Sequence, residues 1–111
     1  MQLPSLVARH LDAIASLCDE YGVRRLDVFG SVTTPAFDAQ RSDVDFLVEF
    51  LPETELGPWM KRYFELRDLL SSLLQRDVDL TLSESITNPW LRKSIEQTRR
   101  MVYASQVPQA A

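Results

Sequence analysis

Several features that would define a class of protein are scarce in this sequence of 111 residues. Its one cysteine, Cys18, excludes an internal disulfide and a cysteine-built zinc site, and it fits a reducing compartment. No apolar run approaches the ~20 residues that cross a bilayer. The first residues also lack the basic and apolar segments of a secretory signal. We therefore expect a cytoplasmic protein with no membrane association.

An excess of positive charge is missing as well. The chain has 12 Lys and Arg against 16 Asp and Glu, a formal net charge of −4. Nucleic-acid-binding domains normally present a basic stripe to phosphate, so no stable nucleic-acid binding is expected. Hydrophobic residues are 45% of the chain and charged residues 25%, as in globular proteins. One domain is expected over residues 1–104, followed by a disordered tail at residues 105–111.

The spacing of apolar residues predicts helices that alternate with strands. Intervals of three and four residues indicate three amphipathic helices, which are expected over residues 4–21, 58–74 and 88–99. Alternation with a period of two predicts strands, which are expected over residues 24–29, 43–50, 77–82 and 100–104. The expected fold is therefore α+β, with a single small mixed β-sheet and flanking helices.

Two further expectations concern residues 32–41 and the buried side of the second predicted helix. Residues 32–41 have little periodicity and are predicted to form a loop, with a short helical turn after Ser31 left open. The second helix is expected to place one set of side chains on its buried side, namely Trp59, Met60, Tyr63, Phe64, Leu70, Leu73 and Leu74.

Five of the nine Asp residues fall in predicted strands, although Asp is a poor strand former. They are Asp27, Asp43, Asp45, Asp77 and Asp79. Asp43 and Asp45 leave the same face of an extended strand, with Cα atoms ~6.5–7 Å apart, and could together bind a hard cation such as Mg²⁺. A solvated strand face is the simpler explanation of a lone Asp-x-Asp. Leu47 continues this face as an apolar residue, however, which favours a central strand with functional carboxylates.

A Gly-Ser pair follows the first predicted strand. Gly30 permits a tight turn close to a ligand, and N–H groups of a helix that begins at Ser31 would point at phosphate. An isolated Gly-Ser is more often a turn without a ligand. Combined with carboxylates on the following strands, the pair indicates phosphoryl or nucleotidyl transfer by in-line displacement with two metal ions.

The spacing of these motifs carries a family resemblance. Gly30-Ser31, ten residues, and then Ser42-Asp43-Val44-Asp45 resemble the signature of the DNA polymerase β-like nucleotidyltransferase superfamily. Residues 26–31 and 43–50 look like the minimal nucleotidyltransferases, the MNT-type proteins of bacteria and archaea. Val78-Asp79-Leu80 resembles the strand that supplies their third carboxylate. The likeness extends over about residues 6–103.

The resemblance implies a role for each matching residue. The nucleotide phosphates of the substrate ATP would be held by Gly30, Ser31 and Ser42. Two Mg²⁺ ions would be bound by Asp43, Asp45 and Asp79. Asp79 would also assist deprotonation of the acceptor hydroxyl. Asp77 is the alternative for this role, because it lies two residues before Asp79 and so on the same face of the predicted strand.

The resemblance also implies a partner. Small members of the superfamily are usually encoded beside a helical HEPN-type protein and act as the antitoxin of the pair, and some transfer AMP from ATP to a tyrosine of that partner. We expect the same activity here. Trp59, Tyr63 and Trp90 could contribute apolar contacts to such an interface, although the core is the simpler assignment for aromatic residues at helical spacing.

One departure from the family pattern leaves an alternative open. Many relatives carry Ala-Arg-Gly just after Gly-Ser, where this chain has Thr33, Thr34 and Pro35. Arg41 or Arg25 could supply the missing guanidinium. The alternative is a catalytically weak or inactive binding module that neutralises a partner by occlusion. A nucleotide-binding regulator that forms homo-oligomers is a third hypothesis, with no distinctive residue behind it.

Overall fold

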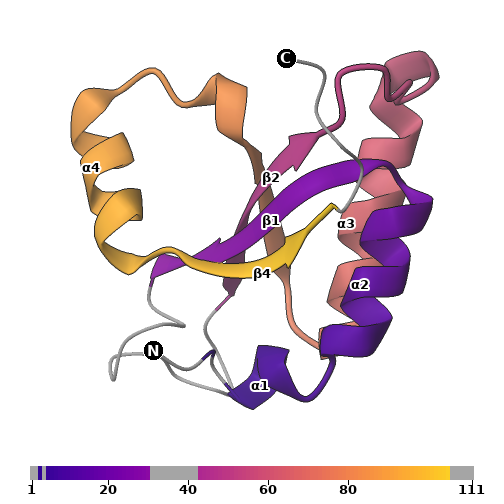
Figure 1. The fold of residues 1–111 in the computed structure, drawn as a ribbon, viewed down its shortest axis with the longest axis horizontal. Coiled ribbons are helices and arrows are strands. Elements are labelled where there is room, and N and C mark those ends of the chain that lie inside the picture. Colours follow the sequence, from indigo (N-terminus) through magenta and orange to yellow (C-terminus); the bar gives the residue numbers. More distant parts are fainter. Residues whose placement is uncertain (1–2, 4, 31–42, 106–111) are drawn as a thin grey trace.

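A four-stranded mixed sheet forms the centre of the fold in the computed structural model, which describes residues 3, 5–30 and 43–105 (Figure 1). The strands, in the spatial order β3-β2-β1-β4, are β1 (Val23–Phe29), β2 (Val44–Phe50), β3 (Val78–Leu82) and β4 (Arg100–Ala104). β1 pairs antiparallel with both β2 and β4, whereas β2 and β3 are parallel. The predicted class, a small mixed sheet with flanking helices, is confirmed.

The helices follow the predicted order with one correction. They are α1 (Ser5–Ala8), α2 (Leu11–Glu20), α3 (Lys61–Leu74) and α4 (Pro89–Thr98), with 3-10 turns η2 (Pro58–Met60) and η3 (Ser83–Ser85). The continuous helix predicted over residues 4–21 is wrong, because a turn at Arg9 and His10 separates α1 from α2. The apolar pattern conceals this break, since Val7, Ile14 and Cys18 on either side of it are all buried.

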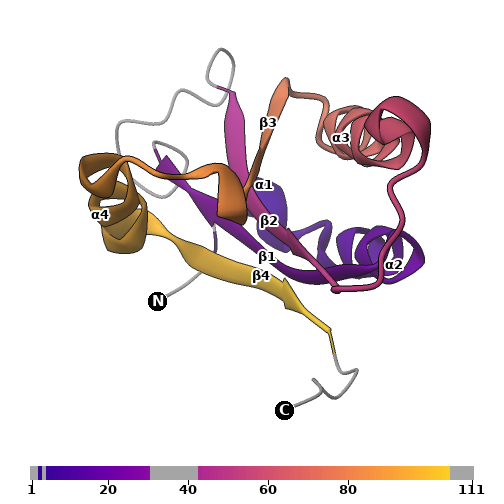
Figure 2. The same ribbon diagram turned by 90° about the horizontal axis from the view of Figure 1, so that it is seen from above.

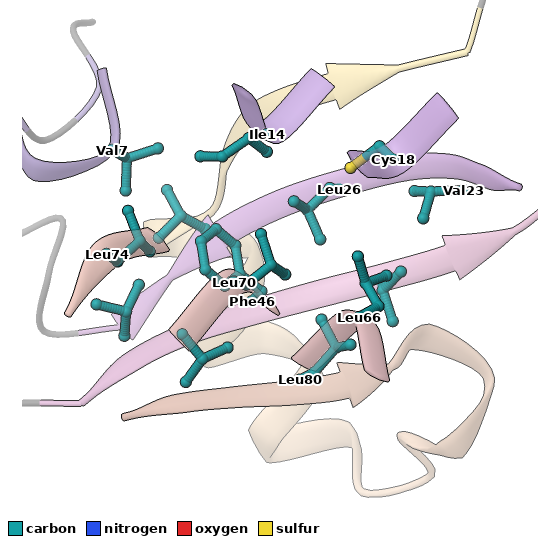
Figure 3. Packing of buried hydrophobic residues seen from close by; sticks show 14 of the residues in the cluster. Val7, Ile14, Cys18, Val23, Leu26, Phe46, Leu66, Leu70, Leu74 and Leu80 are labelled. Atoms are coloured by element: carbon teal, nitrogen blue, oxygen red, sulfur yellow. The ribbon is translucent and has the colours of Figure 1, made fainter. Parts of the chain in front are cut away.

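The main hydrophobic core lies between one face of the sheet and helices α2 and α3 (Figures 2 and 3). Leu26 of β1, Phe46 of β2 and Leu80 of β3 face these helices, which contribute Ile14 and Leu70 among others. The opposite face carries a smaller cluster, in which Phe29 packs against Leu47, Ile86 and Ile95. Ile95 belongs to α4, whereas both α2 and α3 pack on the first face, so among the described residues the second face is the more open one (Figure 2).

The buried side of the second predicted helix differs from the expectation. Trp59 is 94% exposed and Phe64 43% exposed, so both assignments to the core are wrong. For Trp59 the reason is a break before α3, because Trp59 and Met60 have positive φ angles of 57° and 55° and do not continue the helix; Phe64 lies within α3 but outside the row of its buried residues. The fully buried positions of α3 are Leu66, Leu70 and Leu74. Trp90 of α4 is also exposed, at 79%, so the core assignment is wrong for this residue too.

Helix α4 and strand β4 form where the sequence predicts them. Asn88 caps α4, since its Oδ1 accepts hydrogen bonds from the N–H groups of Trp90 and Leu91 at 2.9 and 3.4 Å. Ser105, the first residue of the expected tail, donates its N–H to the Arg24 carbonyl at 2.7 Å. The other residues of that tail lie outside the described part of the chain. Within the described residues, no helix is both long and apolar enough to span a membrane.

Candidate active site

Two of the predicted carboxylates are direct neighbours in the sheet. Asp45 of β2 is the register partner of Asp79 in the parallel strand β3, and of Phe29 in the antiparallel strand β1. Paired residues on adjacent strands leave the same face of a sheet. Asp45 and Asp79 therefore stand side by side on the more open face, at the end of the sheet where β1 finishes.

Two neighbouring carboxylates act on the Asp45 carboxyl, in addition to its burial. Burial, then the negative charge of Asp79 and then that of Asp43, raise the pKa of the Asp45 carboxyl above its ordinary value of 3.8. Asp43 is exposed and directly precedes β2. The described residues include no ready-made group of three or more His, Cys, Asp or Glu side chains arranged to hold a metal ion. Asp43, Asp45 and Asp79 form a carboxylate cluster, and a cation bound beside Asp45 would offset its negative charge.

Gly30 brings the chain into contact with this cluster. It follows β1 with a φ of +79°, a conformation that side chains other than glycine rarely adopt. A Cβ atom at this position would lie 2.9 Å from Oδ2 of Asp45, so the close approach also requires glycine. The N–H of Gly30 donates to Oγ1 of Thr98 at 3.0 Å. Ser31, Ser42 and the other predicted residues of this turn lie outside the described part of the chain.

The geometry distinguishes Asp79 from Asp77. Asp77 precedes β3, and its carbonyl accepts a hydrogen bond from the N–H of Val44 at 2.9 Å. Asp79 pairs with Asp45 and raises its pKa, whereas Asp77 is not among the groups that shift Asp45. The arrangement therefore supports Asp79 as the third carboxylate.

Tyr63 of α3 is a neighbour of Asp79 whose place near the site did not follow from the sequence. Its hydroxyl donates to the carbonyl of Leu80, the residue after Asp79. Burial and the charge of Asp79 raise the pKa of Tyr63, and Arg67 opposes this shift. The α3 helix is thereby tied to β3 at the position of the carboxylate.

A buried ion pair lies beside the site on the same face of the sheet. Asp27 is fully buried in β1, and its carboxylate accepts hydrogen bonds from Nε of Arg99 at 2.5 Å and Nε of Arg25 at 2.9 Å. The suggestion that Arg25 replaces a missing phosphate-binding guanidinium is therefore not supported, because this side chain is engaged by Asp27 well before the end of β1. Arg41, the other candidate, lies outside the described residues. The available signal in the sequence was Asp27 itself, a carboxylate placed between the apolar residues Leu26 and Val28.

Arg99 connects this buried carboxylate to α4. Burial alone would lower the pKa of Arg99, but hydrogen bonds and charges from Asp27 and Glu96 raise it overall, so the guanidinium stays ionised. Since Arg99 directly follows Thr98, the C-terminal end of α4 is fixed twice, by Asp27 within β1 and by Gly30 just after it.

The sheet order, the glycine turn and the paired carboxylates define a nucleotidyltransferase fold. Residues 12–102 match the family model of the nucleotidyltransferase domain, and the chain belongs to this family. A protein of Methanocaldococcus jannaschii, provisionally named a protein adenylyltransferase, is 42% identical over 81 residues, which cover 73% of this chain and 78% of that protein. Protein adenylyltransferase MntA of Thermococcus cleftensis is 36% identical over 89 residues, covering 78% and 80%.

Solved structures agree with this assignment. A structure provisionally described as a minimal nucleotidyltransferase has a TM-score of 0.67 at 32% identity, covering 90% of this chain and 95% of that one. A complex from Shewanella oneidensis, described as a tri-AMPylated HEPN toxin with its MNT antitoxin, matches with a TM-score of 0.61. Its identity is 20%, over 90% of this chain and 74% of that chain, and it shows the fold alone. The predicted membership of the minimal nucleotidyltransferases is confirmed.

Proposed function

We propose that the protein transfers AMP from ATP to a hydroxyl of a partner protein, a tyrosine of a HEPN-type toxin, and thereby acts as the antitoxin of a pair. The observation that carries this proposal is the direct pairing of Asp45 with Asp79 next to Gly30. Relatives named protein adenylyltransferase support the chemistry. The complex of an AMPylated HEPN toxin with an MNT antitoxin supports the partner.

The donor set fits magnesium ions. Asp43, Asp45 and Asp79 offer only carboxylate oxygens, the ligands that Mg²⁺ prefers, and burial together with the charges of Asp79 and Asp43 raises the pKa of Asp45. In this proposal the three residues hold two Mg²⁺ ions. Bound there, Mg²⁺ would neutralise charge on the triphosphate and polarise the phosphoryl group under attack.

The chain's own residues would then align and deprotonate the reactants. Gly30 keeps the turn close to Asp45, and Ser31 and Ser42 are proposed to hold the phosphates. Asp79 would accept the proton of the acceptor hydroxyl, whose oxygen forms a bond to the α-phosphorus while the bond to the β-phosphate breaks. The products are the AMP-modified partner and pyrophosphate.

Intact-mass spectrometry tests this proposal directly. The protein is incubated with Mg-ATP and the protein encoded beside it, and the expected result is an AMP adduct on that partner. Asp43→Asn combined with Asp45→Asn should abolish the adduct. Asp12→Asn combined with Asp19→Asn is the matched control, because it removes the same charge from exposed positions of α2, the helix on the other face of the sheet. Absence of an adduct with the wild-type protein would overturn the proposal.

Neutralisation by occlusion is a second candidate function, favoured by Thr33-Thr34-Pro35 where many relatives have Ala-Arg-Gly. It predicts that the Asp43→Asn and Asp45→Asn double variant still protects cells from the partner. Loss of protection while the two proteins still co-purify would exclude occlusion and favour catalysis.

A further inference from the structure

Two threonine hydroxyls hold the two ends of β1, the strand that leads into the candidate active site. At its beginning, Oγ1 of Thr54 donates to the carbonyl of Gly22 at 3.0 Å. At its end, the N–H of Gly30 donates to Oγ1 of Thr98 at 3.0 Å, across 68 positions of sequence. Both glycines have positive φ angles, +74° and +79°. The two contacts are thus similar in kind, but only one lies at the site.

The Thr98 hydroxyl is oriented by its own helix. It donates back to the carbonyls of Ser94 and Ile95, at 3.4 and 3.5 Å, as threonine in a helix commonly does. Its proton is therefore used within α4, and a lone pair remains to accept the N–H of Gly30. Arg99, the next residue, is fixed by the buried carboxylate of Asp27 at 2.5 Å. The Thr98 hydroxyl that accepts the Gly30 N–H is therefore held in place by its own hydrogen bonds within α4 and by the fixed position of the next residue, Arg99.

A shift of Gly30 would act directly on the carboxylate cluster. A Cβ on Gly30 would lie 2.9 Å from Oδ2 of Asp45, so the turn and this carboxylate are in close contact. We propose that Thr98 is a positioning residue for nucleotidyl transfer, which fixes the turn at Gly30 against Asp45 without contacting the reacting atoms. Since its N–H is occupied by Thr98, Gly30 shapes the turn, and the hydrogen bonds to phosphate come from other groups. This proposal rests on the proposed function.

Three variants separate positioning from general stability. Thr98→Val keeps the side-chain shape and removes the acceptor, whereas Thr98→Ser keeps the hydroxyl. Thr54→Val is the matched control, because it removes an equivalent hydroxyl-to-backbone bond from the other end of β1. All three should fold, with similar decreases in melting temperature for the two valine variants.

Kinetics of AMP transfer provide the first measurement. We expect Thr98→Val to lower kcat/KM by about tenfold or more, since small misplacements in an active site can cost up to about 100-fold. Thr98→Ser and Thr54→Val should stay within about threefold of the wild type. Equal decreases of kcat/KM in Thr98→Val and Thr54→Val would show that Thr98 only stabilises the fold, and would overturn the proposal.

Amide hydrogen exchange of the protein without nucleotide or partner provides the second measurement. The amide of Gly30 should exchange about tenfold or more faster in Thr98→Val, and at the wild-type rate in Thr54→Val. Unchanged exchange at Gly30 would overturn the positioning role. Because this measurement requires no transfer, it still decides the role of Thr98 if the wild-type protein proves inactive, an outcome that would refute only the proposed function.

Discussion

Asp45 and Asp79 are register partners on adjacent parallel strands, although the whole of α3 lies between them in sequence. Neighbouring strands are about 4.8 Å apart, so two negative charges stand closer together than residues i and i+2 of one strand could. The fold thus places two carboxylates opposite each other on adjacent strands, an arrangement of like charges that destabilises a sheet. Such a pair is expected where cation binding compensates for the cost.

Substitutions of Asp79 in β3 and of Asp77 just before it should have different effects on AMP transfer. We expect Asp79→Asn to lower the rate of AMP transfer by about 100-fold or more, the size of effect typical for loss of a catalytic carboxylate. Asp77→Asn should change the rate by less than about threefold, because Asp77 precedes β3 and is not the register partner of Asp45. A time course of adduct formation by intact-mass spectrometry measures both rates. The reverse order would assign the third carboxylate to Asp77.

Burial of Asp45 and the negative charges near it should lower the free energy of unfolding of the metal-free protein at neutral pH. The folded state raises the pKa of Asp45, so its contribution to stability is fully present below the ordinary value of 3.8 and is lost as the pH rises through the folded-state value. Asp45→Asn is therefore expected to increase the free energy of unfolding at pH 7 by about 0.5–1 kcal/mol, and by less at pH 3.5. Urea titrations with a chelator present measure this, and a variant less stable than wild type at pH 7 would contradict it.

Substitution of Gly30 should disturb the site more than an equally strained glycine elsewhere. Gly30→Ala forces a side chain into a φ of +79° and brings its Cβ within 2.9 Å of Asp45, whereas Gly57→Ala at φ +81° meets its nearest neighbour, Lys61, at 3.9 Å. Both variants should lose about 1 kcal/mol or more of stability. Transfer activity should fall sharply in Gly30→Ala alone, and equal activity in the two variants would contradict the close approach.

The buried ion pair should matter far more for stability than an exposed one. Asp27→Ala leaves Arg99 without its buried partner and is expected to cost about 3–5 kcal/mol. Glu49→Ala breaks the half-exposed pair with Arg24 and should cost less than about 1 kcal/mol. Thermal unfolding of both variants compares the two values. Similar melting temperatures would show that Asp27 is not the anchor of α4.

Cys18 should be unreactive while the protein is folded. Burial raises the pKa of this thiol to about 12, so almost no thiolate is present at pH 8. A thiol-specific colorimetric reagent is expected to react with Cys18 only after urea unfolds the chain. Rapid reaction of the folded protein would contradict the burial of this residue.

The sequence predicted the strands because each alternates, and it predicted the carboxylates because Asp-x-Asp is unusual in a strand. It could not predict which strands pair, so the alignment of Asp45 with Asp79 required the structure. The contact of Thr98 could not be predicted either, since nothing in the sequence of its helix indicates that its hydroxyl accepts a hydrogen bond from Gly30. The exposure of Trp59 depends on a backbone break that periodicity does not reveal.

Because β1 lies between β2 and β4 in the sheet, its two neighbouring strands are synthesised at very different times. β1 is complete at Phe29, but its outer neighbour β4 and the contacts of Thr98 and Arg99 come from residues made some 70 positions later. At roughly 5–20 residues per second, a ribosome takes several seconds to supply them. During that interval one edge of β1 is unpaired and Asp27 lacks Arg99. A growing chain therefore contains Asp43, Asp45 and Asp79 before it has the groups that set Gly30 against Asp45.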